Sequence, residues 1–377
     1  MNKLVKKSKY ILLIGSLFII SIYNFYINIR KEENSQNSSQ VIFFIQIILT
    51  TILSFNFLKY FSNSNHINYK FKYWNLNAES LKSIIKYVND VSSEESKNYI
   101  PKEDRIALFD FDGTIYGEKG PLYIEYYMYY DFLKNNPKYL EIEPHKSIYR
   151  RLEKSCKEKK LIDFELEYDA IESEAKIYKG YTIEEHQNFV KKFAENNAKC
   201  FKNLKFRDMF YLPMVEIVEY LQLNNFTVYV VSASDRFLIR EYLKFHFKIP
   251  EQNVIATDVE LMPKSEEENF NKTGKIAREI GKKPVLSFGN SNSDVALQNY
   301  VLNRNKYKSE AYMVVADDIK REYGVDKYDS KGNLDTTKSD EIKRKWKSKE
   351  YGYKVISMRD DFKTIYGENV TLTNYEE

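Results

Sequence analysis

The stretch IALFDFDGTIYG, residues 106–117, is an apolar run that ends in two aspartates, Asp110 and Asp112, followed by glycine and threonine. Aspartate and glycine are frequent where strands end because both suit turns, which gives the stretch a purely structural interpretation. Aspartates spaced by two residues at a strand end, however, direct both side chains toward the crevice in which open α/β sheets bind ligands. An ordinary turn and a ligand site are both open here, and the rest of the chain decides between them.

The overall composition is that of an ordinary globular protein. The chain has 377 residues, of which 43% are hydrophobic and 30% charged, enough for one large or two medium-sized domains. The formal net charge of +4 is small, and no basic block is interleaved with aromatic residues, so we expect no nucleic-acid partner. Cys156 and Cys200 form no CxxC pair and the histidines are far apart, so neither a disulfide framework nor a zinc site is predicted.

Two uncharged apolar runs near the N-terminus predict a membrane anchor. Residues 11–27 and 41–58 each have the length of a bilayer-spanning helix. A signal peptide is the alternative for the first run, but no cleavage pattern follows it and the second run comes soon after. Four lysines precede the first run, so the positive-inside rule places both ends in the cytoplasm. We therefore expect residues 1–62 to form a two-span anchor and the remainder to be a cytoplasmic domain.

Beyond residue 75, strand-like apolar runs alternate with helical patterns. The runs are residues 106–111, 227–233, 254–259, 284–290, 312–317 and 353–358. This alternation predicts an α/β fold with a doubly wound parallel sheet, covered by helices on both faces. Residues 116–215 have few strand signals and are predicted to form an α-helical cap inserted in a core of residues 75–115 and 216–377. A polar segment at 325–350 is expected to be exposed.

Three later segments carry groups that match the paired aspartates chemically. Ser232 ends the second run, where its hydroxyl and the following amides can hold phosphate oxygens. Lys272 and Lys275 precede the fourth run, and Asn290 and Asp294 follow it with oxygen atoms suited to a hard cation such as Mg²⁺. Each group alone has an ordinary explanation as a turn, a solvated helix face or a polar loop. All of them together, in this order, indicate a site.

The order DxDGT, Ser, Lys and G(D/N)xxxD resembles the four-part signature of the haloacid dehalogenase superfamily, over residues 78–367. The helical insertion after the first motif, and the VSxS form of the second, resemble the phosphoserine-phosphatase-like branch. The stretches YIPKEDRIALFDFDGT and IGKKPVLSFGNSNSD also resemble bacterial hydrolases described only as haloacid-dehalogenase-like. The resemblance implies a fold and a chemistry, but it names no substrate.

The resemblance implies a Mg²⁺-dependent phosphatase acting on a small phosphomonoester through an aspartyl-phosphate. Asp110 would be the nucleophile, and Asp112 would protonate the leaving alcohol and then deprotonate the attacking water. Dehalogenases typically lack the second acid, and transport ATPases resemble DKTGT and have many more spans, so neither activity is favoured. A phosphotransferase, and a non-catalytic membrane-tethered binding protein of the same fold, are the alternatives.

The phosphate-binding groups implied by the resemblance are Thr114, Ser232 and one lysine. Lys272 is favoured over Lys275, because Ile276 lies four residues after it and can anchor its helix in the core. The same offset from Lys275 gives a glutamate, and Lys275 is the second choice.

The resemblance also implies the ligands of a magnesium ion, which are Asp110, the backbone carbonyl of Asp112, Asn290 and Asp294. Many relatives have aspartate where this chain has Asn290, so one negative charge is missing and a lower metal affinity is expected. Glu118 lies near the glutamate that holds the substrate head group in phosphoserine phosphatases, although one residue early. A tyrosine cluster at 123–130 either surrounds a quaternary amine by cation–π contact or packs the cap onto the core.

Overall fold

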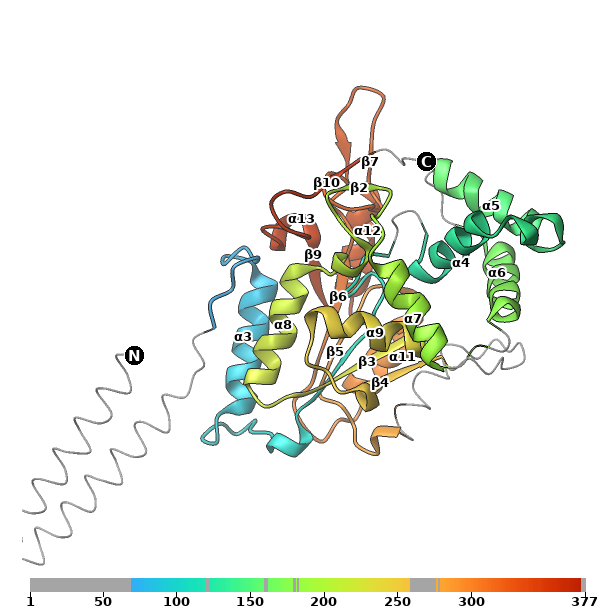
Figure 1. Cartoon of the computed structure of the whole chain (residues 1–377). Coiled ribbons are helices and arrows are strands. Elements are labelled where there is room, and N and C mark those ends of the chain that lie inside the picture. The colour runs from blue at the N-terminus through green and yellow to red at the C-terminus, as the bar shows by residue number, and fades with distance from the viewer. Residues whose placement is uncertain are drawn as a thin grey trace, which may run out of the picture. The chain divides into compact units, whose positions relative to one another are not determined.

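The structure is a computed structural model, which describes residues 69–118, 122–158, 162–178, 181, 183–257, 276 and 279–373 (Figure 1). The described residues all belong to one compact unit, Tyr69–Glu377. Both predicted membrane spans, and the candidate phosphate-binding residues Lys272 and Lys275, lie outside the described residues. Within the part of the chain that the structure describes, no helix has both the length and the apolar character needed to cross a bilayer.

The centre of the fold is a sheet of six parallel strands in the order β4-β3-β1-β5-β6-β9. The strands are β1 (Ile106–Phe109), β3 (Thr227–Asp235), β4 (Val254–Thr257), β5 (Leu286–Gly289), β6 (Glu310–Val315) and β9 (Lys354–Ser357). In the register of the three middle strands, Phe109 lies opposite Val230 on one side and Phe288 on the other. The predicted α/β fold with a parallel sheet is confirmed, and each of the six runs forms a strand.

Both faces of this sheet are buried, because successive side chains of a strand point to opposite faces. In β1, Ala107 and Phe109 join the core cluster that includes the apolar side chains of three helices, α3 (Glu79–Ser92), α8 (Leu212–Leu223) and α9 (Arg236–His246). Ile106 and Leu108 instead pack on the opposite face with α11 (Val295–Leu302). Helices α3 and α8 lie side by side (Figure 1), joined by a hydrogen bond of 3.4 Å between the side chains of Tyr220 and Asn89.

The chain between β1 and α8 is largely helical. It forms α4 (Ile124–Asn135), η2 (Pro137–Glu141), α5 (His145–Glu158), α6 (Phe164–Ile177), α7 (Ile183–Ala194), β2 (Phe201–Lys202) and η3 (Phe206–Asp208). Helices α4, α5 and α6 pack on one another to one side of the sheet, whereas α7 packs on α9 (Figure 1). The predicted end of the insertion, at residue 215, falls inside α8, which packs on β3.

The tyrosines of α4 are mostly packing residues. Tyr126, Tyr127 and Tyr130 are each about 3% exposed. The ring of Tyr130 stacks on Tyr149 of α5 at 5.0 Å, and that of Tyr127 lies 4.9 Å from Phe206. These contacts favour the structural interpretation of the tyrosine cluster over an amine-binding cage.

The segment 325–350 is largely exposed, as expected, but it also forms regular structure. It forms a hairpin of β7 (Lys327–Tyr328) and β8 (Leu334–Asp335), followed by α12 (Thr337–Lys347). Trp346 of α12 is 3% exposed and packs with Met313 of β6 and Tyr353. Trp346 and the partly buried Ile342 pack α12 on the sheet, and the polarity averaged over the segment hides these two side chains.

The remaining elements are short. They are η1 (Lys102–Asp104), η4 (Glu251–Asn253), η5 (Asn292–Asp294), α13 (Met358–Asp361) and β10 (Thr371–Leu372). Strand β10 pairs antiparallel with β2, so the end of the described chain contacts the segment that follows the inserted helices.

Candidate active site

Four of the predicted site residues lie at the carboxyl ends of three adjacent strands, β3, β1 and β5. Asp110 and Asp112 follow β1, Ser232 lies in the last part of β3, and Asn290 follows β5. Because these strands are parallel, their carboxyl ends meet at one edge of the sheet, where open α/β sheets bind ligands. The two aspartates and Ser232 are 6–7% exposed.

The loop after β1 is tight and pressed against Asn290. The Gly113 N–H donates to the Tyr116 carbonyl at 2.8 Å, and the Thr114 N–H donates to the Phe111 carbonyl at 3.3 Å. Gly113 has a φ of +70°, which favours glycine. A Cβ at this position would lie 2.1 Å from Asn290 Nδ2, so the loop has no room for a side chain here.

Thr114 lies between the predicted nucleophile and Asn290. Its hydroxyl oxygen is 3.5 Å from Asp110 Oδ2 and 3.4 Å from Asn290 Oδ1, and the side chain is fully buried. Two oxygen atoms from neighbouring strand ends therefore converge on one hydroxyl group.

Asp294 orients the loop that carries Asn290. Its Oδ2 accepts the backbone N–H groups of Asn290 at 3.0 Å and of Ser291 at 3.1 Å. A Cβ at Gly289 would lie 2.7 Å from the Asp294 Cβ, so glycine is needed for this close approach. Asp294 is fully buried, and its carboxylate holds the loop against the end of β5.

The donor chemistry at this edge fits a hard cation. Oxygen atoms of carboxylates, an amide and a backbone carbonyl are the ligands that Mg²⁺ prefers. Among the described residues, no three or more His, Cys, Asp or Glu side chains gather as a metal-binding group. A site built from Asp110 and Asp294 with an amide and a carbonyl oxygen does not require such a group.

Ser234 is a site residue that the sequence interpretation did not single out. Its hydroxyl donates to Asp112 Oδ2 at 2.7 Å, and its backbone N–H donates to Ser232 Oγ at 3.1 Å. Both Ser234 and Asp112 are 7% exposed. The signal was the spacing of the two serines in VSAS, because residues two apart in a strand point to the same side.

The inserted helices contribute two side chains that meet Asp235, the residue after Ser234. Glu125 of α4 accepts the Asp235 N–H at 2.5 Å, and His186 of α7 lies with Nε2 2.6 Å from Asp235 Oδ2. Asp235 also accepts the N–H of Phe237 at 2.8 Å and so caps α9. The inserted helices thus contact the end of β3, where Ser234 binds Asp112.

These contacts give Glu125 an unusual environment. Burial, followed by the charges of Asp235 and Asp112, raises the pKa of Glu125 to about 8. Burial and the neighbouring Glu125 also raise the pKa of Glu174 on α6 well above its ordinary value. Glu125 is not a sequence neighbour of Asp112 or Asp235, so no local sequence pattern predicts that their charges raise its pKa.

Glu118 lies beside the predicted metal site. Its Oε1 accepts from Asn290 Nδ2 at 3.3 Å and from the Tyr123 hydroxyl at 3.1 Å. The structure therefore brings Glu118 against the loop after β5, where it contacts Asn290, and its predicted contact with a substrate head group stays a prediction.

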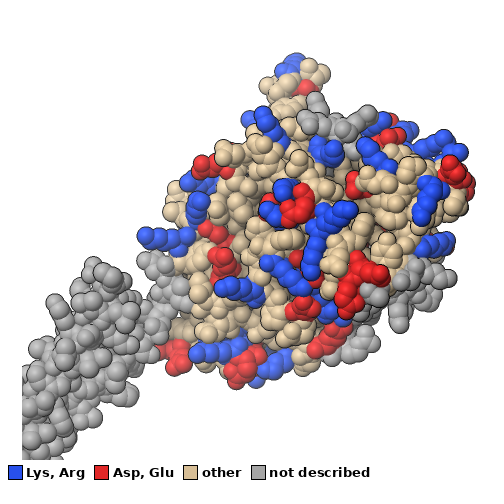
Figure 2. All heavy atoms as spheres, in the orientation of Figure 1, with Lys and Arg blue, Asp and Glu red and all other residues tan. Residues whose placement is uncertain are grey.

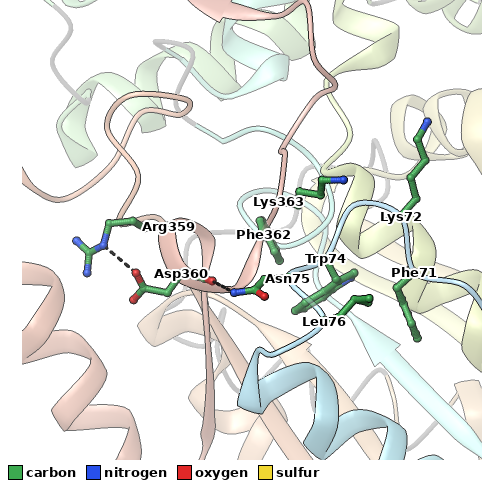
Figure 3. Close-up of a pocket in the computed structure, with 9 residues that line it drawn as sticks. All are labelled: Phe71, Lys72, Trp74, Asn75, Leu76, Arg359, Asp360, Phe362 and Lys363. Atoms are coloured by element: carbon green, nitrogen blue, oxygen red, sulfur yellow. Dashed lines mark hydrogen bonds and ion pairs between the residues drawn. The ribbon is translucent and has the colours of Figure 1, made fainter.

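The surface contains a separate hollow. On the face shown in Figure 2, basic and acidic side chains are interspersed. A cavity of about 470 Å³ is lined by Phe71, Lys72, Trp74, Asn75, Leu76, Arg359, Asp360, Phe362 and Lys363 (Figure 3). In it, Asn75 donates to the Asp360 carbonyl at 3.3 Å and Arg359 to the Asp360 carboxylate at 3.2 Å. None of the predicted site residues lines this cavity.

Comparison with solved structures finds similar chains, including the following three. A protein of unknown function from Bordetella pertussis Tohama I is 16% identical, with 67% of this chain and 97% of that chain covered and a TM-score of 0.41. A phosphoserine phosphohydrolase-like protein from Francisella tularensis subsp. tularensis SCHU S4 is 15% identical, with coverages of 56% and 88% and a TM-score of 0.32. Cytosolic 5'-nucleotidase IIIB bound to cytidine is 11% identical, with coverages of 76% and 89% and a TM-score of 0.37.

Comparison with curated proteins gives no match. The family model of haloacid dehalogenase-like hydrolases matches residues 107–297, which is just over half of the chain. The matched range begins in β1 and ends in α11, so it contains the ends of β1, β3 and β5 that carry the motifs, and the inserted helices. The chain belongs to the haloacid dehalogenase-like hydrolases.

Proposed function

We propose that the protein is a Mg²⁺-dependent phosphatase that cleaves a small phosphomonoester through an aspartyl-phosphate. The observation that carries this proposal is the separate environment of the two aspartates. Asp110 lies beside Thr114, close to Asn290, whereas Asp112 accepts a hydrogen bond from Ser234. Two carboxyl groups with different partners can perform different tasks in one reaction.

In the first step a carboxylate oxygen of Asp110 attacks the phosphorus, and the bond from phosphorus to the substrate oxygen breaks. Asp112 donates its proton to the departing oxygen, so an alcohol leaves. In the second step Asp112 takes a proton from water, whose oxygen attacks the phosphorus and releases inorganic phosphate from Asp110. Thr114 and Ser232 would bind the phosphoryl oxygens, and Lys272 is our proposed cation, with Lys275 the second choice.

Phosphoryl transfer requires that the negative charge of nucleophile and substrate be offset. Asp110, the backbone carbonyl of Asp112, Asn290 and Asp294 would hold Mg²⁺, which when bound supplies this compensating charge. The family match supports a hydrolase, and the hard-oxygen donors at the ends of β1 and β5 support the choice of cation.

Two further assignments complete the proposal. Residues 1–62 would anchor the protein in the membrane by two spans, with the catalytic part in the cytoplasm, as the lysines before the first apolar run indicate. Transfer to an alcohol instead of water is the nearest alternative reaction, because the acceptor that approaches the aspartyl-phosphate decides the outcome.

The test is release of phosphate from nitrophenyl phosphate by the full-length protein. We expect turnover that requires Mg²⁺, is abolished by a chelator and is lost in Asp110→Asn. Asp340→Asn is the matched control, since Asp340 is an exposed aspartate on α12. Turnover in Asp110→Asn equal to that of the parent would refute the proposal, and a protein that binds phosphate without turnover would favour the non-catalytic alternative. A panel of phosphomonoesters would then identify the substrate.

A further inference from the structure

We propose that Glu118 is a positioning residue of the metal site, which holds the Asn290 side chain so that its amide oxygen faces Asp110. This inference rests on the proposed function, because it assigns a part of the proposed Mg²⁺ site. It is an alternative to the expectation that Glu118 holds a substrate head group.

The hydrogen-bonding chemistry of the two side chains fixes the direction of the amide. An ionised carboxylate can only accept hydrogen bonds, whereas an amide has one donating and one accepting end. The end of Asn290 that faces Glu118 must therefore be the nitrogen, and Nδ2 lies 3.3 Å from Glu118 Oε1. The oxygen is then on the other side, where Oδ1 lies 3.4 Å from the Thr114 hydroxyl, next to Asp110.

An asparagine at this position needs such a partner more than an aspartate would. The two oxygens of a carboxylate are equivalent, so either can ligate a cation. If the Asn290 amide turned by half a rotation, its NH₂ group would face the cation and Asn290 would offer it no oxygen. Residues that hold metal ligands in one orientation are an established source of metal affinity.

Glu118 is itself held by a second hydrogen bond, and the first loop leaves space for it. The Tyr123 hydroxyl, at the residue that precedes α4, donates to its Oε1 at 3.1 Å. On the other side, Gly113 leaves room for the contact, since a Cβ there would lie 2.1 Å from Asn290 Nδ2 and 3.0 Å from Glu118 Oε2. The glycine of the DGT motif thus allows Glu118 and Asn290 to meet above the first loop.

The experiment measures Mn²⁺ binding to the full-length protein without substrate, from the electron paramagnetic resonance signal of free Mn²⁺. Glu118→Ala should weaken binding about 10- to 100-fold, the usual effect of removing such a supporting partner. Glu118→Gln should retain most of the affinity, because its carbonyl oxygen can still accept from Asn290 Nδ2. In an Asn290→Asp background, Glu118→Ala should change the affinity little, because a carboxylate needs no orientation.

Three results would overturn the inference. The first is that Glu118→Ala lowers the Mn²⁺ affinity equally in the parent and in the Asn290→Asp background, and that Glu118→Gln lowers it by the same amount. Glu118 would then act through its charge alone. Unchanged Mn²⁺ binding with a raised KM in Glu118→Ala would return Glu118 to the substrate. If the parent protein itself binds no Mn²⁺, the proposed metal-dependent function fails together with the inference. If the parent binds Mn²⁺ and the effects of Glu118→Ala and Asn290→Asp on the affinity simply add, only the role of Glu118 is refuted.

Discussion

Replacing Ser234 by alanine removes the hydroxyl group that holds Asp112. The bond from Ser234 Oγ to Asp112 Oδ2 is 2.7 Å long and joins two side chains that are each 7% exposed. If Asp112 is the general acid and base, this bond fixes the carboxyl group that passes protons in both steps. Ser234→Ala should therefore impair proton transfer and leave the nucleophile Asp110 in place.

The magnitude follows from the kind of bond that is lost. A hydrogen bond to a charged group contributes about 1.5–3 kcal/mol, and about 1.4 kcal/mol corresponds to a tenfold change in rate. The loss should thus be about 10- to 150-fold in kcat for an alkyl phosphate. This is smaller than the factor of about 10² to 10⁴ that general acid–base catalysis usually supplies, as expected for a variant that keeps Asp112 and loses only the bond that holds it.

The assay compares two leaving groups. An alkyl phosphate needs a proton on its leaving oxygen, so its turnover should fall by the full amount. Nitrophenolate leaves with little help from an acid, so the rate of its first release, measured in a rapid-mixing burst before the aspartyl-phosphate is hydrolysed, should change much less. Ser234→Thr, which keeps the hydroxyl, should restore alkyl phosphate turnover, and Ser147→Ala, at an exposed serine of α5, is the control. Equal losses for both leaving groups, or no rescue by threonine, would refute this role of Ser234.

Three further predictions concern other parts of the chain. Lys272→Ala should reduce kcat/KM for nitrophenyl phosphate far more than Lys275→Ala, because one ammonium group contacts the phosphoryl oxygens from the strand-end position; equal losses or the reverse order would contradict the choice. Glu125 has a folded-state pKa of about 8 against an ordinary 4.5, so it favours the folded state most at low pH and loses that contribution as the pH rises from 4.5 toward 8. By pH 7 the loss is at most about 3.5 kcal/mol, at about 1.4 kcal/mol per pKa unit, so the unfolding temperature of Glu125→Gln should fall less between pH 5 and pH 8 than that of the parent; identical curves would exclude this burial effect. A reporter fused to the C-terminus should be active in the cytoplasm, and activity restricted to the other side of the membrane would refute the predicted topology.

The sheet and the convergence of the motifs followed from the sequence because they rest on short-range patterns. Apolar runs separated by helical patterns have few solutions other than a parallel sheet covered on both faces. Once the strands are parallel and adjacent, Asp110, Thr114 and Asn290 meet, because each lies just past the carboxyl end of β1 or β5.

The partners of those residues could not be obtained in the same way. Which hydroxyl of β3 reaches Asp112 depends on the register that places Val230 opposite Phe109, and the strand sequences alone do not set that register. The contacts of Glu125 and His186 with Asp235 depend on how the inserted helices are seated, which local periodicity does not determine.

The neighbours of a residue are harder to predict than its place in the chain. The head-group contact of Glu118 stays a prediction, whereas its hydrogen bond with Asn290 is a property of the folded loops that the sequence did not indicate. Similarly, the polar average over 325–350 hid Trp346, whose buried side chain packs α12 against β6.

The central claim is that Asp110 carries phosphate covalently during turnover, and mass spectrometry of rapidly quenched protein tests it most directly. Asp112→Asn keeps the nucleophile but lacks the proton carrier that activates water, so the hydrolysis of the intermediate should become slow. After this variant is mixed with nitrophenyl phosphate and Mg²⁺, we expect the added mass of one phosphoryl group on the peptide that contains Asp110, and none in Asp110→Asn. Phosphate turnover by Asp110→Asn, or an Asp112→Asn variant that turns over nitrophenyl phosphate and alkyl phosphates like the parent and never accumulates covalent phosphate, would contradict the mechanism.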